Sequence, residues 1–126
     1  MAYKILIAED DIQLVEMYKR KFQLENFEVQ IAEDGQQALD LLETFTPDIA
    51  ILDIMMPKFT GLEVLKEIRN NITTKDMLVI ILTNLDNEST SEEIYKIGAT
   101  DYIVKADMTP LEVTNKVKEI LKIYKK

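Results

Sequence analysis

Two hydrophobic periods alternate along the sequence, and few folds accommodate that order. Short apolar runs typical of buried strands are separated by longer segments with helical spacing. The runs lie at residues 3–8, 27–32, 49–52, 77–82 and 102–104. The order predicts an α/β domain in which five strands alternate with five helices.

The segments between the runs repeat apolar residues three and four positions apart, as amphipathic helices do. The clearest stripes are Ala38, Leu41, Leu42 and Phe45; Leu62, Leu65, Ile68 and Ile72; and Val113, Val117, Ile120, Leu121 and Tyr124. The segment at 88–97 has the weakest helical pattern. Local signals agree, because Asp11 is placed to cap the first helix and Thr109-Pro110-Leu111-Glu112 combines a cap, a first-turn proline and a capping-box glutamate. Asp34-Gly35 and Gly98-Ala99 predict turns.

Strands that are apolar throughout and alternate with helices favour a parallel sheet covered on both faces. Right-handed crossovers bring the carboxyl ends of all strands to one edge, where ligands bind in such sheets. The polar residues that follow the strands are Glu9, Asp10, Asp11, Asp53, Thr83 and Lys105. We therefore expect these side chains to lie close together.

Composition narrows the chemistry and the surroundings of the protein. Without cysteine or histidine, the chain cannot form thiolate zinc sites, cysteine nucleophiles or imidazole bases.

Its 126 residues, 47% of them hydrophobic, suit a single domain spanning 1–126. A net charge of −8 argues against direct nucleic-acid binding. No apolar run approaches the ~18 residues of a membrane span and no signal segment follows Met1, so we expect a cytoplasmic protein without membrane contact.

The strand-end residues suggest phosphoryl chemistry. Carboxylates from neighbouring strands resist joint ionisation unless a cation lies between them, and ligands that are all oxygen favour Mg²⁺. A carboxylate beside such an ion can attack a phosphoryl group and form an acyl phosphate. We predict Asp53 as the nucleophile, Asp10 as a direct metal ligand and Glu9 as a ligand through water. Lys105 and the Thr83 hydroxyl would contact the phosphoryl oxygens.

Four motifs occur in a fixed order along the chain. They are ILIAEDD at 5–11, PDI at 47–49 leading to DIMMP at 53–57 with Gly61 four residues on, IILT at 80–83, and GATDYIVK at 98–105. With these motifs the chain resembles, over essentially its whole length, a receiver domain of bacterial two-component response regulators, of the single-domain, chemotaxis-regulator-like kind. The resemblance implies a doubly wound, flavodoxin-like (βα)5 fold with strand order 2-1-3-4-5.

The same resemblance implies how the domain would work. Asp53 would be phosphorylated by a sensor histidine kinase or a phosphotransfer protein, with Mg²⁺ bound by Asp10, Asp53 and the Met55 carbonyl. Thr83 and Tyr102 would be the switch pair, in which the hydroxyl moves toward the phosphoryl group and the ring turns inward. The domain would promote its own phosphorylation and dephosphorylation without being an enzyme for a separate substrate.

The output would be carried by the surface of the fourth helix, fifth strand and fifth helix. Because no further segment follows Lys126 in this sequence, we expect that surface to control the binding of a downstream protein, or the domain to relay the phosphoryl group. The candidate contact residues on that surface are Tyr95, Lys96, Asp107, Glu112 and Lys116.

Two positions depart from the family pattern. The residue after Thr83 is usually small, whereas here Asn84 would narrow access to the phosphoryl group or donate a hydrogen bond to it. The lysine is usually followed by a cis proline, whereas here Ala106 follows Lys105. A non-proline cis bond costs about 2.5–4 kcal/mol, and the sequence leaves open whether the bond is cis.

Three other functions remain as alternatives. An Mg²⁺-dependent phosphohydrolase with an aspartyl phosphate usually has a second acid where this chain has Met55. A flavodoxin-like redox protein would need a phosphate-cradling loop, which the glycine-poor loops do not supply. A receiver that docks to partners without phosphorylation is kept open by Asn84 and Ala106.

Overall fold

The computed structural model describes residues 2–84 and 88–125, which form one parallel sheet covered by helices. The strands are β1 (Lys4–Ala8), β2 (Glu28–Ala32), β3 (Ile49–Asp53), β4 (Leu78–Thr83) and β5 (Asp101–Val104). They pair in the order β2-β1-β3-β4-β5, and every pair is parallel. The predicted fold class and strand order are therefore confirmed.

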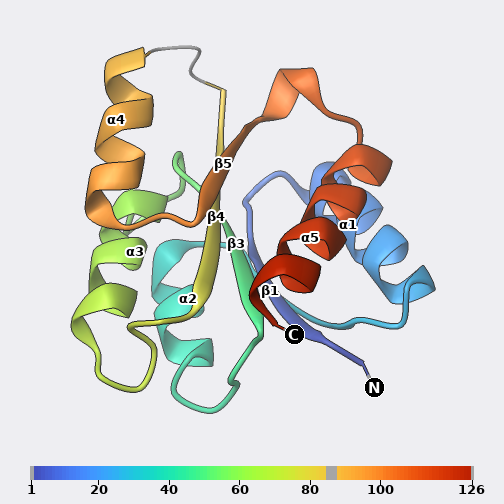
Figure 1. Ribbon diagram of the computed structural model, residues 1–126, viewed down its shortest axis with the longest axis horizontal. Helices are drawn as coiled ribbons and strands as arrows, with labels where there is room; N and C mark the ends of the chain where they lie inside the picture. The colour runs from blue at the N-terminus through green and yellow to red at the C-terminus, as the bar shows by residue number, and fades with distance from the viewer. Residues whose placement is uncertain (1, 85–87, 126) are drawn as a thin grey trace.

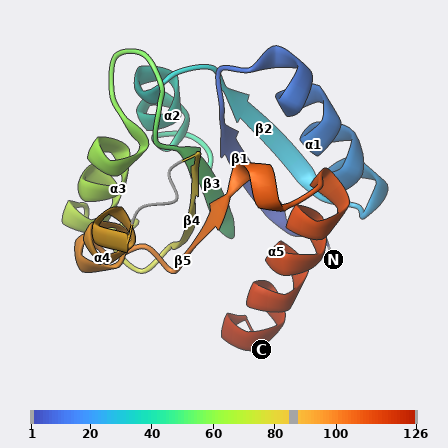
Figure 2. The ribbon, with the colours of Figure 1, turned by 90° about the horizontal axis from the view of Figure 1, so that it is seen from above.

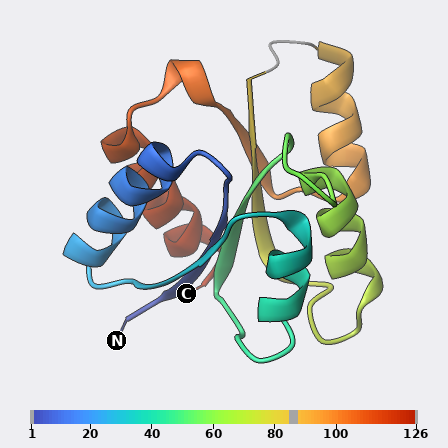
Figure 3. The ribbon, with the colours of Figure 1, turned by 180° about the vertical axis from the view of Figure 1, so that it is seen from behind.

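Helices lie on both faces of the sheet. They are α1 (Ile12–Leu24), α2 (Gly35–Leu41), α3 (Gly61–Asn70), α4 (Glu88–Ile97) and α5 (Pro110–Tyr124), with a short 3-10 turn, η1 (Lys105–Asp107), after β5. The helices α1 and α5 cover one face, and α2, α3 and α4 cover the other (Figures 1 and 2). Figure 3 shows the same two groups from behind. No helix in the described part of the chain is long and apolar enough to cross a lipid bilayer.

The two faces of the sheet have separate cores. Alternate residues of a strand point to opposite faces, so Ile5 and Ile7 pack with α1 and α5, while Leu6 and Ala8 pack with α2, α3 and α4. Every residue of β3 and β4 is buried. This double burial explains why the strands appear in the sequence as continuous apolar runs.

The local start signals act as predicted. The Asp11 carboxylate accepts a hydrogen bond from Leu14 N at 3.2 Å and caps α1. Thr109 and Glu112 form a capping box at the start of α5. Asp34-Gly35 is the start of α2, with Asp34 as its cap, and not a separate turn. Gly98 has a φ of 118°, which suits the predicted turn before β5.

Three predicted stripe positions lie off their helices or off the core. The helix α2 ends at Leu41, so Phe45 packs against the core from the following turn. The helix α3 ends at Asn70 and the next residue is extended, which leaves Ile72 83% exposed. Tyr124, the last residue of α5, is 60% exposed.

Candidate functional site at the strand ends

The carboxyl ends of β1 and β3 bring three carboxylates together. The two strands are neighbours in the sheet, with Ala8 beside Leu52. Glu9 N donates to Ala32 O at 3.0 Å and so continues the pairing of β1 with β2, while Asp53 is the last residue of β3. One carboxylate oxygen from each of Glu9, Asp10 and Asp53 lies within 4.8 Å of the others.

The ammonium of Lys105 lies between two of these carboxylates. Its Nζ is 2.6 Å from Glu9 Oε2 and 2.8 Å from Asp53 Oδ2. Lys105 begins η1 directly after β5. Every peptide bond in the described residues is trans. The structure thus answers the question that the sequence left open, because the loop runs trans through Ala106 and the lysine still reaches the acidic cluster.

Glu9 and Asp53 are buried, whereas Asp10 is exposed at the mouth of the site. Glu9 Oε1 accepts from Asp11 N at 3.1 Å, and Asp53 Oδ1 accepts from Met55 N at 3.3 Å. Glu9 Oε2 has no aligned hydrogen bond among the described residues, and its contact with Lys105 is an ion pair. One buried carboxylate oxygen is therefore only partly satisfied.

Burial shifts the titration of these groups in predictable directions. Loss of solvent raises the pKa of Glu9 to about 7, although the Lys105 ammonium and the Asp11 amide act in the opposite direction. Burial would lower the pKa of Lys105, but contacts with the Asp53 and Glu9 carboxylates raise it above its usual range. Lys105 consequently remains an ammonium at neutral pH.

The donor set fits a hard divalent cation. Three carboxylates face one ammonium, so the cluster has an excess of negative charge, and all available ligand atoms are oxygens. The buried Asp53 offers a ligand atom inside the site, and the exposed Asp10 offers one at the entrance. Glu9, whose Oε2 is paired with Lys105, would act through water. Met55 lies at the rim with its side chain 67% exposed. These residues would suit Mg²⁺.

The predicted switch residues lie on β4 and β5. Thr83 ends β4, is 2% exposed and pairs with Val104. Tyr102 lies on β5, and its half-buried ring packs against Tyr95 of α4, with 5.6 Å between the ring centroids and 73° between the ring planes. Asn84 follows Thr83 and is exposed.

Two features of the site escaped the sequence-based prediction. Gly61 approaches the backbone of Asp53 so closely that an added Cβ would lie 2.3 Å from the Asp53 carbonyl oxygen. Tyr18, on α1, is 1% exposed; burial, followed by the nearby charges of Glu9 and Asp53, raises the pKa of its hydroxyl to about 12. Helical spacing from Val15 and Phe22 indicates that Tyr18 is a core residue, but carries no signal for its proximity to the carboxylates.

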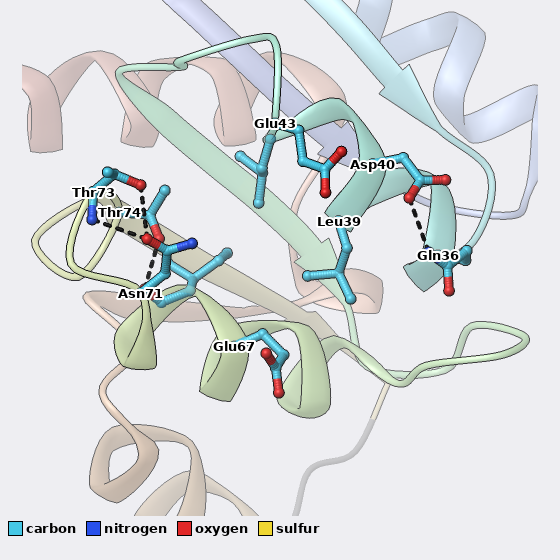
Figure 4. A pocket seen from close by; sticks show the side chains of 10 residues that line it. Gln36, Leu39, Asp40, Glu43, Glu67, Asn71, Thr73 and Thr74 are labelled. Carbon is cyan, nitrogen blue, oxygen red and sulfur yellow. Dashed lines mark hydrogen bonds between the residues drawn. The ribbon is translucent and has the colours of Figure 1, made fainter.

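A separate recess lies between α2 and α3 (Figure 4). Its volume is about 490 Å³, and its lining includes Asp40, Glu43 and Glu67. None of the strand-end residues lines it. This recess is therefore not part of the candidate site.

Comparisons with known proteins point in one direction. The family model described as "Response regulator receiver domain" matches residues 5–118. The response regulator MprA of Mycolicibacterium vanbaalenii is 36% identical over 105 residues, which are 83% of this chain and 45% of that protein. The chain thus spans less than half the length of the curated relatives it matches.

Solved structures resemble the whole described fold. The receiver domain of the Francisella response regulator 1452 matches with a TM-score of 0.86 and 32% identity, over 95% of this chain and 97% of that one. The chemotaxis response regulator CheY4 of Vibrio cholerae matches with a TM-score of 0.90 and 28% identity, over 96% of this chain and all of that one.

Proposed function

The chain belongs to the family of response regulator receiver domains, and from that premise we propose that Asp53 is the phosphoacceptor of this signalling module. The observation that carries the assignment is the position of Lys105 Nζ, 2.8 Å from Asp53 Oδ2 inside the acidic cluster. Asp53 also ends β3, the middle strand of the sheet, whereas Glu9 and Asp10 follow β1. We assign residues 1–126 to one such domain.

The proposed reaction moves a phosphoryl group from a donor to Asp53. Response regulators are phosphorylated by histidine kinases, so the donor would be a phosphohistidine of a sensor kinase or a phosphotransfer protein. An Asp53 carboxylate oxygen forms the new bond to phosphorus while the bond between phosphorus and the imidazole nitrogen breaks. The imidazole leaves with that electron pair and takes a proton from water.

The residues around Asp53 would stabilise the transferred group. Lys105 stays charged and already contacts the acceptor carboxylate. Its ammonium can therefore pair with the phosphoryl oxygens during the transfer. Asp10, Asp53 and the Met55 carbonyl would hold Mg²⁺, with Glu9 acting through water. When bound, Mg²⁺ supplies positive charge to the phosphoryl oxygens.

Thr83 and Tyr102 would transmit the modification. The Thr83 hydroxyl would move toward the phosphoryl group and Tyr102 would turn inward, changing the surface of α4, β5 and α5. That surface would control the binding of a downstream protein, or the domain would relay the phosphoryl group onward. The domain would also promote its own dephosphorylation. We keep a cytoplasmic location, without direct nucleic-acid or membrane contact by this domain, as part of the proposal.

The test is intact-protein mass spectrometry after incubation with acetyl phosphate, with and without Mg²⁺. We expect a single phosphoryl adduct that requires Mg²⁺ and is absent from Asp53→Asn. The matched control is Asp40→Asn, which removes an exposed carboxylate outside the site and should retain the adduct.

Two results would contradict the assignment. An adduct that survives in Asp53→Asn would show that another residue is the acceptor. A folded wild-type protein that gains no adduct from acetyl phosphate or from a phosphohistidine donor would favour the alternative of a receiver that docks without phosphorylation.

A further inference from the structure

The helices α4 and α5 lie on either side of β5 (Figure 1). Asp101, the first residue of β5, connects all three elements. Its Oδ1 accepts hydrogen bonds from the Tyr95 hydroxyl at 2.9 Å and from Tyr102 N at 2.7 Å. Its Oδ2 lies 3.2 Å from Lys116 Nζ. One carboxylate therefore ties α4 and α5 to the first residues of β5.

The hydrogen bond to Asp101 also fixes the ring of Tyr95. Although Tyr95 is 48% exposed, its hydroxyl is held by Asp101 and its ring packs edge-on against Tyr102. Partial burial and the bond to Asp101 raise the pKa of Tyr95 to about 12, so the hydroxyl remains a donor at neutral pH. The Tyr102 ring therefore packs against an aromatic ring whose position is fixed by a hydrogen bond to Asp101.

We propose that the Tyr95–Asp101 hydrogen bond is a latch that holds the Tyr102 ring in its present, partly buried position against Tyr95 and so opposes phosphorylation. This inference rests on the proposed function, because it assumes that phosphorylation turns Tyr102 inward. An inward ring would give up its contact with Tyr95. A latch that favours the present ring position must then weaken the binding of any ligand of Asp53 that favours the inward position. The loss of affinity follows from the ratio of the two populations.

Tyr95 and Asp101 are positioning residues in this scheme, because neither is a member of the acidic cluster at Asp53. Their effect would be exerted only through Tyr102. The variant Tyr95→Phe removes the hydroxyl and retains the ring, so it breaks the latch with little change in packing.

The experiment uses beryllofluoride with Mg²⁺ as a non-hydrolysable substitute for the phosphoryl group. NMR of protein with ¹³C-labelled tyrosine rings follows Tyr102, identified by its loss in Tyr102→Phe. We expect Tyr95→Phe to bind beryllofluoride about three- to tenfold more tightly than wild type, as the loss of one hydrogen bond allows. In the ligand-free variant, a soluble gadolinium chelate should broaden the Tyr102 ring signals less than in wild type.

Two control variants separate the latch from general effects. Tyr124→Phe makes the same chemical change at a residue that is 60% exposed, and should leave the affinity unchanged. Lys116→Met removes the ion pair with Asp101 but leaves the Tyr95 hydroxyl and its acceptor in place. It should shift the affinity less than Tyr95→Phe does.

The outcomes distinguish this inference from the proposed function. If wild type binds beryllofluoride but Tyr95→Phe binds it equally or more weakly, the latch is wrong and the phosphoacceptor assignment stands. If wild type does not bind it, the phosphoacceptor assignment fails. In that case the gadolinium experiment on the ligand-free protein still tests the latch. If the Tyr102 ring is equally exposed in Tyr95→Phe and in wild type, the latch is wrong.

Discussion

At the scale of single residues, the acidic cluster is a balance of buried charge. Two buried carboxylates, on Glu9 and Asp53, share the ammonium of Lys105. Ion pairs removed from water cost desolvation energy that only close contacts offset. The strand-end positions of these residues were sufficient to predict that they meet. The geometry of the Lys105–Ala106 peptide bond was not predictable, because the sequence has no proline at 106 to favour the cis form.

Tyr18 carries a buried titratable hydroxyl whose pKa is raised by burial and by the charges of Glu9 and Asp53, and alkaline pH should reveal it. Its folded-state pKa is raised to about 12 from an ordinary value of 10. As pH rises above 10, the unfolded chain loses this proton first, so the unfolded state binds fewer protons and the free energy of unfolding falls. By pH 11 we expect this one group to lower it by about 1 kcal/mol.

Urea unfolding at pH 8 and pH 11 measures the effect as the difference between wild type and Tyr18→Phe. The variant should lose less stability over this interval. Tyr124→Phe, at an exposed tyrosine, should lose as much as wild type. Equal losses in wild type and Tyr18→Phe would refute the buried-hydroxyl explanation.

At the scale of elements, the junction of β3 and α3 depends on close backbone approach. Gly61 is the first residue of α3, and its amide donates to Ile54 O at 3.1 Å. The ideal Cβ at Gly61 would be 2.3 Å from Asp53 O and 3.1 Å from Ile54 Cα. The neighbouring atoms are backbone, so they cannot move aside without displacing Asp53 itself.

Replacing Gly61 by alanine should therefore reverse the usual preference of helices for alanine. We expect Gly61→Ala to lower the free energy of unfolding by about 1–3 kcal/mol, as overpacked sites do. Asn70→Ala, at the exposed end of the same helix, should change it by less than about 0.5 kcal/mol. Chemical denaturation of both variants measures the contrast, and a fully stable Gly61→Ala would disprove the steric argument.

Element boundaries show where sequence patterns stop being informative. The apolar spacing correctly predicts that Phe45 packs on the core, but the chain reaches that contact from a turn after α2. Ile72 fits the same spacing and is exposed, because the residue after Asn70 leaves helical geometry. A periodic pattern reports which side chains are apolar; it does not report where the backbone hydrogen bonds end.

At the scale of the molecule, alternating strands and helices were enough to predict the parallel sheet and the edge at which the acidic residues meet. The order of the strands was not derivable in this way. It came from the resemblance of the four motifs to a family, because loop lengths alone permit several windings. The fold then places Glu9 and Asp53 side by side, at the carboxyl ends of strands that are neighbours in the sheet but not in the sequence.

Because the net charge is −8, any added cation screens repulsion between the acidic groups and so stabilises the protein. A test of Mg²⁺ binding must therefore separate this screening from binding at one site. At ten times its dissociation constant, Mg²⁺ should raise the free energy of unfolding by about 1.4 kcal/mol over NaCl of equal ionic strength. Asp10→Asn should abolish this gain. Asp40→Asn changes the net charge equally and should keep it, so thermal unfolding of the pair separates a site from general screening. Equal losses in both variants would contradict a specific site.

The free edge of the sheet at β5 sets a limit on how other proteins can attach. Strand β5 has only four residues, and the backbone amide of Tyr102 is already occupied by the Asp101 side chain. A short edge with a charged residue bound to its own backbone is a poor template for another strand. Proteins that recognise this side of the molecule would therefore contact its side chains, and the same feature disfavours edge-to-edge joining of sheets through β5.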